Sequence, residues 1–225
     1  LVKLLHDFLN PMSNIIINLG GTIDKYMGDA IMALFGAPLA QPDHPRLACR
    51  AALEMVSSLA ALNQTWAEQG RPPLKVGVGV NTGPVAVGNM GSDRLFDYTA
   101  IGDNVNLASR LAGLNKYYGT STLISDTTAM ALKNGFILRD VDLVRVKGKA
   151  QGVRIHELIG EGEPDPELAR FLELHHRALA LYREKRFSES AGVFTEALQL
   201  RPADATCLRY LTLAQKHHET PPAHD

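Results

Sequence analysis

The sequence predicts an α+β fold followed by an all-helical segment, and three observations lead to this prediction. Apolar residues recur at helical spacing over residues 2–19 and again over residues 44–69. Between and after these helices, short apolar runs are separated by glycine-containing turns, which is typical of antiparallel strands. After residue 160 the composition shifts to helix-forming residues. We therefore expect a first domain at residues 1–159, a linker at 160–166, a helical segment at 167–218 and a tail at 219–225.

Glycine and proline set the order of the first elements. Gly20 and Gly21 end the first helix, and a hairpin follows over residues 22–35. Pro45 lies in the first turn of the second helix, which the Arg-Pro-Pro sequence at 71–73 brings to an end. These breaks separate two amphipathic helices from the hairpin between them.

The next elements continue this pattern. Residues 74–80 alternate and predict a strand that turns at 81–83 and returns over residues 84–90. Residues 96–111 predict a short strand that leads directly into a helix. Two hairpins separated by a helix predict a mostly antiparallel sheet that is covered on one side.

Composition narrows the classes of function. The 225 residues are 45% hydrophobic and 21% charged, which suits one or two domains with a buried core. A formal net charge of -1 without a basic patch argues against nucleic acid as a partner. Cys49 and Cys207 are far apart and are expected to be reduced thiols. The eight histidines do not have the spacing of a zinc site.

The chain has no apolar run of the ~18 residues that a membrane span needs, so we expect a soluble, cytoplasmic chain. It begins at Leu1 without a secretory signal pattern, which predicts a fragment of a longer protein. The missing upstream region could still anchor that protein in a membrane.

A carboxylate in the first hairpin is a candidate metal ligand. Asp29 follows Gly28 at a turn between two apolar runs, where flanking strands would fix its oxygens for a hard cation such as Mg²⁺. The alternative is a solvated Asp in an ordinary turn, since Gly-Asp pairs are common turn residues.

A second candidate site lies on the helix after residue 102. Asn106 and Arg110 are four residues apart and share one helical face, so an amide and a guanidinium could act on one substrate. An Arg beside an Asn on an otherwise apolar helix needs an anionic or polar partner. The alternative is that Arg110 pairs with a nearby carboxylate.

With residues 76–83 between them and residues 146–149 after them, these two segments resemble the catalytic domain of class III adenylyl and guanylyl cyclases. The resemblance covers residues 1–159 and implies a ferredoxin-like core. It also implies that the ribose 3′-oxygen of ATP attacks the α-phosphorus to give 3′,5′-cyclic AMP and pyrophosphate. Two Mg²⁺ or Mn²⁺ ions per site are implied to support this step.

The resemblance assigns roles to residues that meet the phosphates and ribose. Asp29 aligns with one of two metal-binding Asp residues, Arg110 with the transition-state arginine, and Asn106 with the residue that orients the ribose. Lys147 and Lys75 align with the cations that meet the terminal phosphates.

Two further positions align with the residues that select the purine. Lys25 would donate to a ring nitrogen of adenine and Thr99 would accept from the exocyclic amine, so ATP is favoured over GTP. The Lys and Thr pair resembles one subgroup of adenylate cyclases. Guanylate cyclase activity remains the alternative within the family.

In the family, each active site is shared between two chains, so a homodimer is implied. Asp29 and Lys75 would come from one protomer, whereas Lys25, Thr99, Asn106, Arg110 and Lys147 would come from the other.

The other metal-binding Asp of the family would fall before Leu1. Asp7 lies in the first helix and Asp24 is expected on the wrong strand face, so neither replaces it. The printed chain is therefore expected to be inactive, and its sheet to have an uncovered edge. A catalytically inactive module that dimerises and regulates a partner is the alternative of a different class.

The helical segment resembles one tetratricopeptide repeat. Small and large residues alternate over residues 178–202 as two packed helices require. Because one repeat rarely buries enough surface to stand alone, two interpretations remain: a helical hairpin docked on the cyclase core, or part of an array that binds a protein partner.

Overall fold

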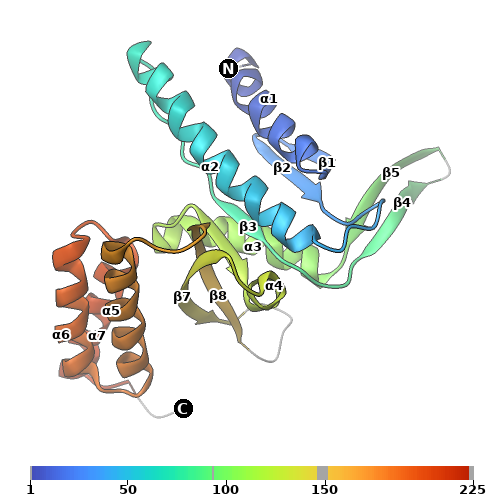
Figure 1. Ribbon diagram of the computed structural model, residues 1–225. Helices are drawn as coiled ribbons and strands as arrows, with labels where there is room; N and C mark the ends of the chain where they lie inside the picture. The colour runs from blue at the N-terminus through green and yellow to red at the C-terminus, as the bar shows by residue number, and fades with distance from the viewer. Residues whose placement is uncertain (1, 93, 146–151, 223–225) are drawn as a thin grey trace.

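The computed structural model describes residues 2–92, 94–145 and 152–222 (Figure 1). Lys147 lies outside these residues. The first part contains two long helices and a hairpin, as the sequence predicted. In chain order these elements are α1 (Val2–Asn18), β1 (Thr22–Met27), β2 (Ala30–Leu34) and α2 (His44–Glu68).

A shorter mixed region follows and contains the remaining strands. Its elements are β3 (Val78–Val80), β4 (Ala86–Ser92), β5 (Leu95–Ile101), α3 (Asp103–Tyr118), β6 (Thr122–Ser125), α4 (Asp126–Leu132), β7 (Phe136–Val144) and β8 (Val153–Glu161). Three helices complete the described chain: α5 (Pro166–Arg183), α6 (Phe187–Leu200) and α7 (Ala205–Glu219).

The strands of the described residues form three separate sheets. A four-stranded sheet has the order β3-β6-β8-β7, and two hairpins, β1-β2 and β4-β5, stand apart from it. The predicted pairing of residues 74–80 with 84–90 is wrong, because only residues 78–80 form a strand and they pair in parallel with β6. Residues 86–92 pair instead with β5. β3 is therefore an edge of the four-stranded sheet.

The four-stranded sheet is covered on both faces, which corrects the expectation of one-sided cover. Successive residues of β6 point to opposite faces. Leu123 packs with Leu107 and Leu111 of α3, whereas Ile124 packs with Cys49 and its neighbours on α2. All four residues of β6 are buried for this reason.

Helix α3 lies directly against β3 because two glycines leave room for its backbone. A Cβ at Gly79 would stand 2.1 Å from the carbonyl oxygen of Ala108, and one at Gly77 would stand 2.4 Å from that of Ala112. The buried Asn115 side chain then donates from Nδ2 to the carbonyl of Val78 at 2.9 Å. These contacts fix the helix on the sheet.

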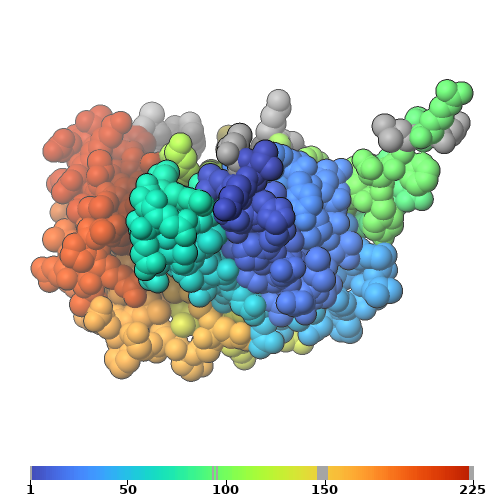
Figure 2. All heavy atoms as spheres, turned by 90° about the horizontal axis from the view of Figure 1, so that it is seen from above, coloured from blue at the N-terminus to red at the C-terminus, as the bar shows by residue number. Residues whose placement is uncertain are grey.

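The helical segment is docked on the sheet. β8 ends at Glu161, within the range predicted as a linker, and α5 begins at Pro166. Ile137 of β7 and Ile159 of β8 pack against the core of α5, α6 and α7. In Figures 1 and 2 these three helices lie at the opposite end of the molecule from the β4-β5 hairpin, which projects from the body.

A buried arginine joins the sheet to the helical segment. Arg139 of β7 is 3% exposed, and its guanidinium lies 2.6 Å from Glu157 Oε2 and 2.7 Å from Asp204 Oδ2. Asp204 also caps α7 by accepting from the backbone N–H of Cys207. One ion-pair cluster thus connects β7, β8 and the start of α7.

Among the described residues, no helix is long and apolar enough to cross a membrane. Cys49 and Cys207 are both buried free thiols, as expected. His175 is also buried, where its Nε2 donates to the carbonyl of Asp140 at 2.8 Å. The ring is a core group with satisfied hydrogen bonds.

Candidate active site

Asp29 stands at the turn between β1 and β2. Gly28 has a φ of +68°, a left-handed conformation that favours glycine, and a Cβ there would meet nothing within 4 Å. The glycine is therefore needed for the backbone angle and not for space. The Asp29 side chain that follows it is exposed.

The described residues do not complete a metal site. They contain no group of three His, Cys, Asp or Glu residues placed to hold a metal ion. Asp29 supplies one carboxylate, whereas Mg²⁺ requires near-octahedral coordination by six oxygens. Asp29 fits the role of one ligand among several.

Lys25 and Thr99, the two predicted purine-selecting residues, are brought together by a third residue. Asp24 of β1 accepts a hydrogen bond from Thr99 Oγ1 at 2.6 Å and another from the backbone N–H of Ala100 at 3.2 Å. Lys25 Nζ lies 3.3 Å from the other oxygen of the same carboxylate. Sequence reasoning did not assign Asp24 to the site.

An irregularity in β1 explains this arrangement. The register with β2 shifts between Ile23 and Lys25, so Asp24 is an extra residue in the strand. Such a bulge re-aims a side chain that would otherwise alternate with its neighbour. The expectation that Asp24 lies on the wrong strand face had assumed regular alternation. No signal in the sequence marks the bulge.

Asn106 and Arg110 lie on the outward face of α3, and both are exposed. The opposite face of α3 is buried against the sheet and consists of Leu107, Leu111, Asn115 and Tyr118. Gly102, with a φ of +139°, allows the turn from β5 into the helix. The predicted sharing of one helical face is confirmed.

The start of α3 is held by the segment that follows β3. Asn81 Nδ2 donates to the carbonyl of Asn104 at 3.0 Å, and Asn104 Nδ2 donates to the carbonyl of Pro84 at 2.8 Å. These bonds join residues 81–84 to the first turn of α3, which also carries Asn106. The position of the helix is therefore fixed at both ends.

The structure places only one of the two predicted phosphate-binding cations, Lys75 and Lys147. Lys75 is exposed in a stretch without regular secondary structure before β3, and no described contact links it to the other site residues. Lys147 falls outside the described residues.

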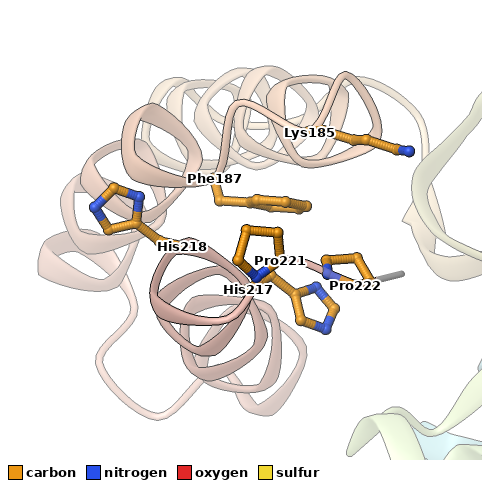
Figure 3. Close-up of a pocket in the computed structure, with 6 residues that line it drawn as sticks. All are labelled: Lys185, Phe187, His217, His218, Pro221 and Pro222. Carbon is orange, nitrogen blue, oxygen red and sulfur yellow. The ribbon is translucent and has the colours of Figure 1, made fainter. Parts of the chain in front are cut away.

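A shallow hollow lies elsewhere, on the helical segment. It is lined by Lys185, Phe187, His217, His218, Pro221 and Pro222 (Figure 3). Phe187 and His217, two of these lining residues, meet edge to face with ring centroids 5.3 Å apart. None of the predicted site residues lines this hollow, so it does not belong to the candidate active site.

A mixed sheet, two separate hairpins and an outward-facing Asn and Arg on the adjoining helix are the features of a nucleotide cyclase type of catalytic domain. The family model for the adenylate and guanylate cyclase catalytic domain matches residues 1–160, and the chain belongs to this family. The prediction from the sequence motifs is confirmed at this level.

Relatives of both substrate classes resemble the chain. It is 35% identical over 159 residues to adenylate cyclase 1 of Rhizobium meliloti (strain 1021), a match that covers 71% of this chain and 24% of the relative. The structure of the guanylyl cyclase Cya2 is 38% identical with a TM-score of 0.66, covering 73% of this chain and 83% of that one. The adenylyl cyclase CyaB from P. aeruginosa is 38% identical with a TM-score of 0.65, covering 72% and 83%.

The chain thus spans about a quarter of the length of the Rhizobium relative. The two solved relatives have equal identity to the chain, but one is a guanylyl cyclase and the other an adenylyl cyclase. Overall similarity therefore does not decide the base, and the choice has to be argued from individual residues.

Proposed function

We propose that this protein is an adenylate cyclase that converts ATP to 3′,5′-cyclic AMP and pyrophosphate. The observation that carries the proposal is the pairing of Lys25 and Thr99 on one carboxylate, between strand β1 of one hairpin and strand β5 of the other. Lys offers only N–H donors, whereas a hydroxyl oxygen can accept. A donor beside an acceptor matches the ring nitrogen and exocyclic amine of adenine.

Asn106 and Arg110 support the same activity. Their outward face on α3 offers an amide to the ribose and a guanidinium to the developing charge on the α-phosphate. Asp29 would contribute one carboxylate to Mg²⁺ or Mn²⁺, which when bound lowers the cost of deprotonating the 3′-hydroxyl. Lys75 and Lys147 are proposed contacts for the terminal phosphates.

The proposed enzyme is a homodimer. Large apolar side chains remain exposed on the two hairpins of the single chain: Tyr26, Met27, Phe96, Tyr98 and Ile101. Exposed apolar groups gathered on neighbouring hairpins favour burial against another protein surface. A twofold dimer would cover them and place Asp29 of one chain near Arg110 of its partner.

For the helical segment, we propose a structural role, which is to support the sheet through Arg139. A tetratricopeptide-like partner-binding role is proposed in addition, because small residues such as Ala178 and Ala197 allow large ones such as Phe194 to pack between the helices.

Product analysis tests the activity. The purified protein, expressed with any coding sequence that precedes Leu1, is incubated separately with ATP and GTP in the presence of Mn²⁺, and the products are separated by chromatography. We expect cyclic AMP and pyrophosphate from ATP and much less cyclic GMP from GTP. Cyclic GMP as the main product would favour a guanylate cyclase, and no cyclic nucleotide from either substrate would favour a regulatory module.

Mixing two inactive variants tests the shared site. Asp29→Ala and Arg110→Ala are each expected to be inactive as homodimers. In an equal mixture about half of the dimers are mixed and have one intact site, so about a quarter of the wild-type activity should return. No recovery after subunit exchange would contradict an active site built from two chains.

A further inference from the structure

Asp24 is a buried carboxylate at the edge of an otherwise open site. Its side chain has no exposed surface, although it belongs to a hairpin whose tip is exposed. Oδ2 accepts from Thr99 and from the backbone of Ala100, while Oδ1 accepts no hydrogen bond among the described residues. A buried carboxylate is costly, so its retention beside Thr99 calls for an explanation.

The direction of the bond to Thr99 follows from the chemistry of the two groups. An ionised carboxylate only accepts hydrogen bonds, and a hydroxyl carries a single hydrogen. The 2.6 Å contact therefore places the hydrogen of Thr99 on the line to Asp24. Towards any other group, the Thr99 oxygen can then only accept a hydrogen bond.

Burial makes this direction hard to reverse. Thr99 is 7% exposed, so little water is available to compete for its hydrogen. The bond to a charged acceptor is also stronger than one between neutral groups. The second hydrogen bond, from Ala100 N–H, fixes the carboxylate to the backbone of the strand that bears Thr99.

We propose that Asp24 is a positioning residue for purine selection, which makes Thr99 an obligatory acceptor and holds Lys25 beside it as the donor. This inference rests on the proposed function. A base that offers an acceptor followed by an N–H donor, as adenine does, satisfies both groups. Guanine offers the reverse order, an N–H and a carbonyl oxygen, and leaves the Thr99 acceptor facing another acceptor.

The bulge at Asp24 is part of the same arrangement. With regular alternation, the side chains of residues 24 and 25 would point to opposite faces of the hairpin. The register shift allows Lys25 Nζ to lie 3.3 Å from Asp24 while Asp24 reaches Thr99. Donor and acceptor are thereby set side by side on two strands that are not in one sheet.

The test is the isosteric variant Asp24→Asn, measured as the ratio of kcat/KM for ATP to that for GTP. An amide can donate as well as accept, so Thr99 is free to turn its hydrogen towards the base. We expect the ratio to fall about tenfold or more. Because both substrates are measured on one preparation, a change in the amount of folded protein cancels from the ratio.

Two further variants separate positioning from general damage. Thr99→Val removes the hydroxyl and should lower the ratio similarly, and Asp24→Asn added to it should cause no further fall, because coupled residues are not additive. Asp43→Asn makes the same chemical change at an exposed Asp before α2 and should leave the ratio unchanged. A ratio within twofold of wild type for Asp24→Asn, or multiplying effects in the double variant, would overturn the inference.

Binding measurements distinguish this inference from the proposed function. Thermal-shift titrations of the same variants with ATP and with GTP report base preference without turnover. If the protein makes no cyclic nucleotide but Asp24→Asn still weakens its preference for ATP, the proposed activity fails and the role of Asp24 stands. If it makes cyclic AMP and the variant keeps the wild-type preference, the role of Asp24 fails and the activity stands.

Discussion

Asp24 and Arg139 are both buried charges, but they differ in what surrounds them. Arg139 lies between two carboxylates of its own chain, and the side chains of Glu157 and Asp204 are 18% and 14% exposed. Asp24 faces Lys25, whose side chain is 39% exposed. The chain covers most of the first cluster, while the second contains a more exposed member, Lys25, at which a ligand can bind.

This difference distinguishes groups that stabilise the fold from groups that lie at the candidate active site. Burial of a charge is costly unless it is paired, so a closed cluster such as that of Arg139 acts on stability when one member is removed. An exposed group such as Arg110 adds little to stability. It can still supply charge to a reacting phosphate, and its removal should act on rate.

The largest effect on stability is expected from Arg139→Ala. The change leaves Glu157 and Asp204 close together without their cation, and it should lower the free energy of unfolding by about 3–5 kcal/mol. Urea denaturation measures this. Arg170→Ala removes an exposed partner of Glu173 and should cost less than about 1 kcal/mol. Equal losses of stability in the two variants would contradict the distinction between the buried and the exposed ion pair.

Arg110→Ala should lower activity and leave stability nearly unchanged, which is the opposite of the effect expected for Arg139→Ala. Removing a donor aimed at developing charge typically lowers kcat by ~10²–10³. The melting temperature should stay close to that of the wild type, because Arg110 is exposed. Lys116→Ala, an exposed cation in the last turn of the same helix, serves as the control and should retain activity. A stable but fully active Arg110→Ala protein would argue against its proposed role.

Gly79→Ala tests whether the close packing of α3 on β3 is needed for both stability and activity. The new methyl group would stand within 2.4 Å of two backbone atoms of α3, so the helix must shift. We expect a loss of about 1–3 kcal/mol in stability, together with reduced activity. Gly113→Ala is the matched control within α3, since a Cβ there meets nothing within 4 Å and alanine favours a helix. Its stability should be equal or higher.

A gradual dependence of stability on pH is expected from His175. Burial, followed by the nearby charge of Arg139, lowers the pKa of His175 from 6.5 to about 3. Between these pH values the unfolded chain binds one more proton at this residue than the folded chain. The stability contributed by the neutral ring is therefore complete above pH 6.5 and falls as the pH drops towards 3, by about 1.4 kcal/mol per unit.

Denaturation at several pH values checks this slope. His175→Gln should be less stable overall but should lose this part of the slope, whereas His218→Gln, at an exposed position of α7, should keep it. An unchanged slope in His175→Gln would assign the acid sensitivity to other groups.

Local patterns predicted much of the fold. The bounds of α1, the β1-β2 hairpin and α2 follow from apolar spacing, Gly20, Gly28 and Pro45, which act through neighbouring residues. The pairing of residues 84–90 was predicted wrongly, because strand pairing depends on distant partners. Residues 95–101 also have strand character, and they form the strand that pairs with residues 86–92.

The site was predictable to a similar extent. Asn106 and Arg110 share a face because four residues make about one helical turn, which a sequence contains directly. Asp24 was missed because a bulge in β1 and a hydrogen bond to β5 bring it to Thr99, which is 75 residues away in the sequence.

The sequence by itself determined the helices, the turn at Gly28 and the family of the chain, because these depend on residue types at fixed short spacings. Only the tertiary structure decided which strands pair, how Arg139 joins the sheet to the helical segment, and which hydrogen-bonding direction is left to Thr99. These features arise from groups far apart in the chain, whose energies depend on burial and distance once the fold has brought them together.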